Sequence, residues 1–189
     1  MSILVLSGSL RSDSLHGKLA RLAADELSTR GIDATLLSLA DYPLPIYDDS
    51  IEKRDGIPDG ASALRRLFAR HHGFVLANPE YNGSVTPLLK NTLDWISRKN
   101  PETAGLQPFA NKLALIVATS PGTGGGLRAA KHLRDILNSL GAFVLPRQVT
   151  IPNSAQSFDE AGQLLNPRHR EQLSAELGAL IAISGKLAA

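Results

Sequence analysis

The sequence contains no cysteine. This absence excludes disulfide bonds, thiolate metal ligands and cysteine nucleophiles together. An excess of charge of one sign is also missing, because 20 basic residues stand against 18 acidic ones and leave a formal net charge of +2. Nucleic-acid-binding domains carry a far larger basic excess, so we expect no nucleic-acid partner.

Long hydrophobic runs and an export signal are absent as well. The apolar runs stay far below the roughly 20 residues that a membrane helix needs. The amino terminus enters an apolar run directly, with no basic segment before it and no cleavage site after it. His132 and His169 have no carboxylate at ligand spacing. We therefore expect no membrane association, no metal site and a cytoplasmic protein.

The remaining composition is that of an ordinary globular protein. The chain has 189 residues, of which 43% are hydrophobic and 20% are charged. This length is enough for one sizeable core, and no linker or internal repeat interrupts it. We expect residues 1–189 to form a single domain.

Five apolar runs alternate with five helical patterns along the chain. The apolar runs are 3–6, 34–39, 73–77, 113–118 and 142–145, and the helical patterns are 15–30, 61–71, 86–99, 127–140 and 167–187. This alternation predicts a doubly wound α/β fold, with a five-stranded parallel sheet and helices on both faces. Between the second strand and the second helix, residues 42–58 are rich in proline and aspartate but keep aromatic and aliphatic residues. We interpret them as a functional or covering loop.

The loop after the first strand has the composition of a phosphate site. It carries several serine hydroxyls and Arg11 just before a helix begins, and the amino end of a helix favours an anion. The alternative is capping alone, in which Ser12 or Ser14 satisfies the helix and Arg11 is solvated. A Walker loop is excluded because eight residues separate Gly8 from Gly17-Lys18 and Leu19 follows.

The loops after the third and fourth strands suit a flat ring better than a second phosphate. Tyr81 can lie beside an aromatic system, and the backbone of 80–83 can bond to its edge. The glycines of 122–126, Gly122 among them, let backbone approach a ligand closely, although Leu127 replaces the third glycine of the dinucleotide fingerprint. The alternative is that 78–84 is only a hairpin turn or an ordinary loop. In parallel sheets all three loops open on one edge, and a phosphate with a polar ring describes FMN.

Several motifs together resemble the NADPH-dependent FMN reductase family over nearly the whole chain. They are Gly8-Ser9-Leu10-Arg11 with Ser14, Pro79-Glu80-Tyr81-Asn82, Leu89-Lys90-Asn91 and Asp94-Trp95. The resemblance implies a flavodoxin-like fold. It also implies that Ser9, Arg11 and Ser14 hold the FMN phosphate, and that Pro79, Glu80, Tyr81, Asn82 and Ser120 surround the ring. Where the family usually has asparagine this chain has His16, which can also donate to phosphate, more strongly when protonated.

The resemblance further implies an oxidoreductase in which a reduced nicotinamide, NADPH or NADH, passes hydride to the bound flavin. A small acceptor then takes the place of the nicotinamide and is reduced by the flavin. This acceptor is a quinone, an azo dye, a metal oxyanion or free flavin. The flavin carries the chemistry, so we expect no catalytic side chain. The alternatives are a flavodoxin-type electron carrier, which is commonly strongly acidic, a non-catalytic nucleotide sensor, and a hydrolase using Ser9 or Ser120. Neither serine lies in a nucleophile elbow.

The helix expected at 86–99 carries two apolar stripes. One faces the sheet, and the second contains Leu88, Thr92 and Trp95. Burial of this second stripe predicts a homodimer, and the resemblance implies dimers or tetramers. The alternative is that loop 42–58 covers the stripe.

Overall fold

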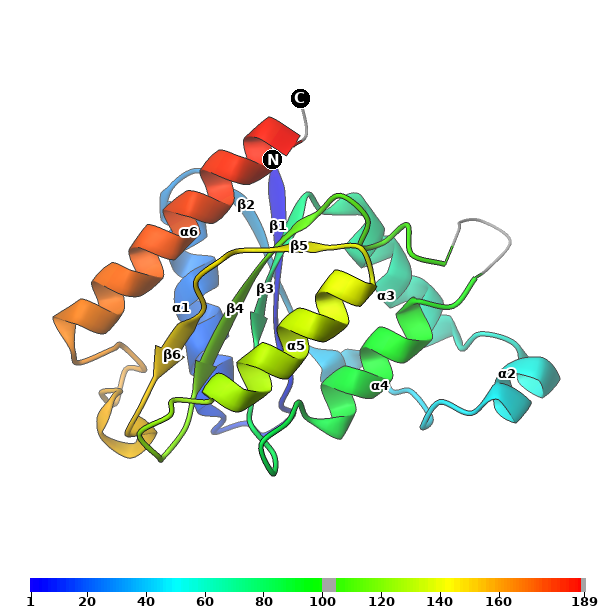
Figure 1. Ribbon diagram of the computed structural model, residues 1–189, viewed down its shortest axis with the longest axis horizontal. Helices are drawn as coiled ribbons and strands as arrows, with labels where there is room; N and C mark the ends of the chain where they lie inside the picture. Colours follow the sequence, from blue (N-terminus) through cyan, green and yellow to red (C-terminus); the bar gives the residue numbers. More distant parts are fainter. Residues whose placement is uncertain (100–104, 188–189) are drawn as a thin grey trace.

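The computed structural model describes residues 1–99 and 105–187, and a parallel β-sheet runs through its centre (Figure 1). The strands are β1 (Ser2–Ser7), β2 (Asp33–Leu37), β3 (Gly73–Ala77), β4 (Leu113–Thr119), β5 (Phe143–Val144) and β6 (Val149–Ile151). The helices are α1 (Leu15–Thr29), α2 (Asp49–Asp55), α3 (Asp59–Arg70), α4 (Pro87–Ile96), α5 (Leu127–Ser139) and α6 (Pro167–Leu187), with short 3-10 turns η1 (Leu39–Asp41) and η2 (Ser154–Gln156).

The strand order is β2-β1-β3-β4-β5, with β6 also paired to β4. Helices cover both faces of this sheet: α1 and α6 lie on one, and α3, α4 and α5 on the other (Figure 1). Alternate residues of β1 divide between the two cores, since Ile3 and Val5 pack towards α1 and α6 while Leu4 and Leu6 pack on the opposite side. A strand buried on both faces reads as a continuous apolar run. The predicted doubly wound α/β fold is confirmed.

The fifth strand position differs from the sequence prediction. A single strand was expected at 142–145, but β5 has only two residues, and β6, which was not predicted, follows it. β5 pairs with the start of β4 and β6 with its end. Pro146 lies between them and has no N–H to donate to a ladder. The fifth strand is therefore split in two.

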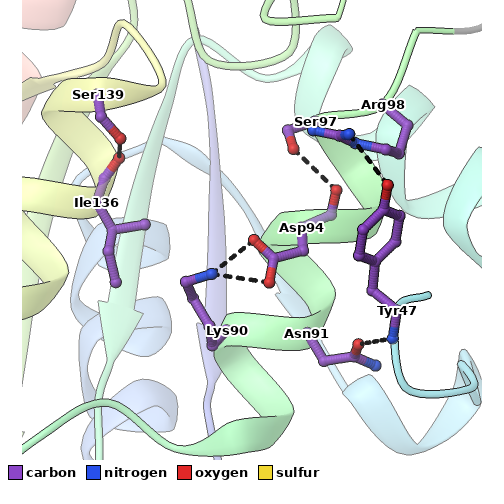
Figure 2. Close-up of polar contacts among 8 residues, drawn as sticks. All are labelled: Tyr47, Lys90, Asn91, Asp94, Ser97, Arg98, Ile136 and Ser139. Atoms are coloured by element: carbon purple, nitrogen blue, oxygen red, sulfur yellow. Dashed lines mark hydrogen bonds and ion pairs between the residues drawn. The ribbon is translucent and has the colours of Figure 1, made fainter. Parts of the chain in front are cut away.

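The segment 42–58 wraps over the outer side of α4 and includes the short helix α2, which was not predicted. The indole Nε1 of Trp95 donates to the carbonyl of Pro45 at 2.7 Å. The ring of Tyr47 packs edge-on against the indole, with 5.0 Å between ring centroids. Figure 2 shows the backbone N–H of Tyr47 donating to Asn91, at 2.7 Å. Trp95 is consequently fully buried within one chain.

This packing corrects the argument for an interface between subunits. The stripe of Leu88, Thr92 and Trp95 does not require a second subunit, because loop 42–58 covers the tryptophan and Leu88 is half-buried against the same core. The alternative interpretation of the loop as a cover was correct. The burial of Trp95 therefore gives no support to the predicted dimer.

The helix expected at 86–99 ends earlier, at Ile96. The buried guanidinium of Arg65, on α3, donates to the carbonyls of Ile96 and Arg98 at 2.6 Å each. Helix carbonyls at a carboxyl end have no partner within the helix, so this cation satisfies them and stabilises the end of α4.

Two further findings concern the described part of the chain. No helix there is both long and apolar enough to cross a membrane. No group of three or more histidine, aspartate or glutamate side chains gathers there in a way that could hold a metal ion.

Candidate cofactor site

The loops after β1, β3 and β4 meet at the carboxyl edge of the sheet, as the topology requires. Together they enclose one cavity of about 220 Å³. Eight of the ten predicted site residues line it: Ser9, Arg11, Ser14, His16, Pro79, Glu80, Tyr81 and Ser120. Asn82 and Gly122 do not. The sequence analysis missed the lining residues Asp13, Leu15, Thr119, Pro121 and Ser154.

The first loop is held in shape by its own serines. The hydroxyl oxygen of Ser9 accepts from the backbone N–H of Arg11, and that of Ser14 accepts from Gly17 to cap α1, at 3.3 Å in both cases. Capping by Ser14 was part of the alternative reading of this loop, and it does occur. The backbone N–H groups of Leu10 and Ser12 make no hydrogen bond within the described residues. Unpaired donors beside a helix amino end suit an anion.

Arg11 is engaged locally by its neighbour Asp13. Its Nε and a terminal nitrogen donate to the two carboxylate oxygens at 3.0 and 2.7 Å. Both side chains are exposed, and the guanidinium holds the pKa of Asp13 below its usual value through this hydrogen bond. A phosphate bound in this loop has to draw Arg11 away from a competing carboxylate.

His16 connects two elements of the cavity wall. Its Nε2 accepts from the backbone N–H of Thr119 at 3.2 Å, which ties α1 to the end of β4. Burial lowers the pKa of His16 to about 4. The ring lines the cavity and is neutral near pH 7, so a hydrogen bond from His16 to a phosphate would come from the neutral ring and not from the stronger protonated form.

The second loop is both a turn and a strand-to-helix connection. The backbones of Tyr81 and Ser84 exchange two hydrogen bonds of 3.0 Å around Asn82 and Gly83. Both central residues have positive φ, 51° and 80°, which favours Asn-Gly. The turn projects the Tyr81 side chain at the cavity with 52% of its surface exposed. Asn82 lies at the tip of the turn, which is why it does not line the cavity.

Helix α5 clamps this loop. The carboxylate of Glu80 accepts from Nε of Arg128 at 3.0 Å and from the backbone N–H of Ala129 at 3.3 Å. The hydroxyl of Ser84 and Nδ1 of His132, one turn further along α5, are 3.0 Å apart. The Glu80 side chain is thus committed to the amino end of α5. Its backbone, rather than its carboxylate, is what the loop can offer to a ring.

The third loop is tied to β6. The backbone N–H of Ser120 and the hydroxyl of Thr119 both donate to the carbonyl of Ile151, at 3.2 and 2.8 Å. Gly122 points its carbonyl back to the Ser120 hydroxyl, at 3.3 Å, and so shapes the loop from outside the cavity. Ser154 enters the cavity wall through η2, just after β6, and it was missed because β6 was missed.

Thr86 and Gly8 join the first two loops. The hydroxyl of Thr86 donates to the carbonyl of Gly8 at 2.8 Å and accepts from the backbone N–H of Leu89 at 3.2 Å, where it caps α4. A Cβ on Gly8 would approach Pro79 to 3.1 Å and Leu89 to 3.2 Å. A larger residue here would push these neighbours apart by a few tenths of an ångström, so glycine suits the close approach of the first loop to the second.

The donor set and the shape of the site fit FMN. The first loop offers serine hydroxyls and the Arg11 guanidinium to the cavity wall, which suit a phosphate. The second loop offers the exposed Tyr81 ring and turn backbone, which suit a heteroaromatic ring. This arrangement on a 2-1-3-4-5 sheet places the protein in the class of flavodoxin-like flavoproteins.

Comparison with known proteins narrows the class. The model of the family described as NADPH-dependent FMN reductase matches residues 1–156. The chain belongs to this family, and it is an oxidoreductase that uses FMN and NAD(P)H.

Individual relatives match this chain along nearly their whole length. The chain is 34% identical to a quinone reductase of Escherichia coli over 182 residues, which is 95% of this chain and 93% of the relative. It is 35% identical to an NAD(P)H-dependent FMN reductase of Pseudomonas aeruginosa over 181 residues, again 95% and 93%. The solved structure of FerB, a flavoenzyme NAD(P)H:acceptor oxidoreductase from Paracoccus denitrificans, superposes with a TM-score of 0.80. Its identity is 25%, and the match covers 98% of this chain and 97% of FerB.

Proposed function

We propose that this chain binds FMN in the cavity described above and uses NADPH or NADH to reduce a small acceptor. The observation that carries the proposal is the meeting of three separate loops at one cavity, with serine hydroxyls and Arg11 from the first loop and Tyr81 from the second. When bound, FMN supplies the redox chemistry, because it can take a hydride equivalent from a nicotinamide and give it to an acceptor. Among the acceptors considered, the relatives named quinone reductase favour a quinone, with free flavin next.

The proposed roles of the residues follow from their places in the cavity. Ser9, Arg11 and Ser14, with the free N–H groups of the first loop, hold the phosphate. Pro79 to Tyr81 and Ser120 surround the ring, while Asn82 shapes the turn and Gly122 shapes the third loop. His16 acts as a neutral wall that joins α1 to β4.

Among the described residues, no carboxylate of the second loop is free to act as a general base. Glu80 is the only carboxylate from the second loop in the cavity wall, and it is bound to Arg128 and to the amino end of α5. The protein's contribution is therefore to position the ring and to leave one face accessible, as the exposure of Tyr81 allows.

A homodimer or homotetramer also stays a proposal, as do the single domain over 1–189 and a cytoplasmic location. Without the argument from Trp95, the proposal of an oligomer rests on family membership alone. Light scattering on the flavin-loaded protein tests it, and a mass near the 20.1 kDa of one chain contradicts it.

The first experiment separates the enzyme from a flavodoxin-type carrier. The purified protein, reconstituted with FMN, should show visible flavin bands that bleach rapidly when NADPH or NADH is added without oxygen. Admitting a quinone should restore the bands. Flavin bands that persist in the presence of both nicotinamides would support the carrier instead.

A second experiment tests the phosphate site. Arg11→Ala should weaken FMN roughly tenfold to a hundredfold, the value of one charge-assisted hydrogen bond. Riboflavin, which has no phosphate, should bind almost unchanged. Arg66→Ala removes an exposed arginine from α3 and serves as the matched control. Equal weakening of FMN and riboflavin would mean that Arg11 supports the loop rather than the anion.

A further inference from the structure

A second cavity lies on the other side of the phosphate loop. Its volume is about 460 Å³, and it is bounded by the first turns of α1 and by residues 36–39 at the carboxyl end of β2. Ser9, Arg11 and Ser14 line both cavities, so the two are separated only by the loop that carries these residues. The function proposed above uses the loop residues that the two cavities share, but not the side chains of Leu10, Lys18, Arg21 or Leu36.

The charge of this cavity is of one sign. Arg11, Lys18 and Arg21 line it, and no aspartate or glutamate does. The side chains of Lys18 and Arg21 form no hydrogen bond or ion pair with the rest of the described chain. Asp13 lines the first cavity and pairs with Arg11, which is the main cause that lowers its pKa, and Lys18 acts in the same direction. Two cations without partners around a hollow favour an anionic group.

The same cavity also presents apolar surface. Leu10 and Leu36 line it from opposite elements, the phosphate loop and β2, and they are 57% and 39% exposed. Exposed leucines beside a cationic hollow suit a ligand that joins a flat apolar ring to a phosphate. A phosphorylated adenosine has this chemistry.

We propose that the second cavity binds the 2′-phosphoadenosine part of NADPH, with Arg21 and Lys18 on the 2′-phosphate and the adenine between Leu10 and Leu36. This inference rests on the proposed function and extends it, because it selects NADPH over NADH. In doubly wound folds a base at the end of the second strand can accommodate that phosphate. Here the cation comes from α1 and faces the same strand end. The shared loop lets one dinucleotide extend from the nicotinamide at the first cavity to the adenosine at the second.

Adenosine 2′,5′-bisphosphate is the direct probe, because it carries the 2′-phosphate and no nicotinamide. Calorimetry on the FMN-loaded protein should detect its binding, and 5′-AMP should bind at least tenfold more weakly. Arg21→Ala should weaken the bisphosphate about tenfold or more, the value of one charge-assisted contact. Lys18→Ala should act in the same direction, and Arg66→Ala, an exposed arginine on α3, should have no effect.

Steady-state kinetics give the second readout. Arg21→Ala should raise the ratio of KM for NADPH to KM for NADH about tenfold, with kcat for NADPH little changed. The flavin spectrum and the FMN content should match those of the wild type, which shows that the variant is folded and loaded.

Three outcomes overturn the inference: no binding of the bisphosphate to the loaded protein, displacement of FMN by the bisphosphate, or an equal rise of both KM values. Displacement would mean that the second cavity is part of the FMN site. Failure of the proposed function looks different, because then neither nicotinamide bleaches the flavin although the bisphosphate isotherm can still be measured.

Discussion

The hydroxyl of Thr86 is a single atom that supports both main loops of the cofactor site, and its removal should be measurable. Thr86→Val keeps the shape and volume of the side chain but deletes the oxygen. Two hydrogen bonds are lost, one to the Gly8 carbonyl and one from the Leu89 N–H. Thr86 is 2% exposed, so water cannot easily replace either partner.

The magnitude follows from the two contacts. Loss of an N-cap costs about 1 kcal/mol, and a buried carbonyl left without a donor costs about 1–3 kcal/mol. Together Thr86→Val should lower the free energy of unfolding by about 2–4 kcal/mol. With a urea m-value of about 2 kcal/mol/M, the midpoint should fall by about 1–2 M.

Urea unfolding of the flavin-free protein is the assay, and Thr86→Ser is the matched control because it keeps the hydroxyl. FMN affinity should also fall in the valine variant, because the Gly8 carbonyl anchors the start of the phosphate loop. If the valine and serine variants unfold at the same urea concentration, Thr86 contributes only its packing. The argument that it joins the two loops would then be refuted.

Three further predictions test other parts of the structure. Burial lowers the pKa of His16 from 6.5 to about 4 in the folded chain. As the pH drops from 6.5 to 4, the unfolded chain therefore takes up a proton that the folded chain does not, and the free energy of unfolding should fall by up to about 3 kcal/mol. His16→Asn should flatten this pH profile in urea melts, and an unchanged profile contradicts the assignment. Lys112 donates to the carbonyls of Phe68 and Ala69 at the end of α3, and Lys112→Met should therefore cost about 1–2 kcal/mol by the same assay. Its FMN affinity should be unchanged, since the residue lies beyond the amino end of β4, and a weaker FMN titration would count against this. The single Trp95 should emit at short wavelength and resist iodide quenching even in dilute monomer, and a quenchable, red-shifted spectrum would show that loop 42–58 does not cover it.

The three central strands β1, β3 and β4 could be predicted because each is a short apolar run buried on both faces, and the edge strand β2 could be predicted from its apolar residues although it is partly exposed. The three-residue β6 could not be recognised by length, although Val149-Thr150-Ile151 is β-branched throughout and lies between Pro146 and Pro152. Helix α2 had a usable signal in Asp48, whose side chain accepts from the backbone N–H of Ser50 at 2.7 Å. Both elements are too short for periodicity to register.

The site was predictable where topology alone decides the outcome. Loops that follow parallel strands must open on one edge, so Ser9, Tyr81 and Ser120 meet whatever their detailed conformation. The pairing of Glu80 with Arg128 was not predictable, because the partners are 48 residues apart and depend on the course of the second loop. The path of 42–58 over Trp95 was not predictable either, because the sequence of the helix does not determine which segment covers its outer stripe.

The division of the fifth strand has a consequence for how the molecule behaves in a crowded solution. An edge strand normally offers a row of unpaired amides and carbonyls to any other extended chain, which is a route to aggregation. Here β5 is only two residues long. The guanidinium of Arg134 donates hydrogen bonds to the carbonyls of Val144, at the end of β5, and of Leu145 and Pro146, which follow it. A foreign strand meets too short a template, with several of its acceptors already taken. The interruption that hid β6 in the sequence thus disfavours growth of the sheet at its β5 edge.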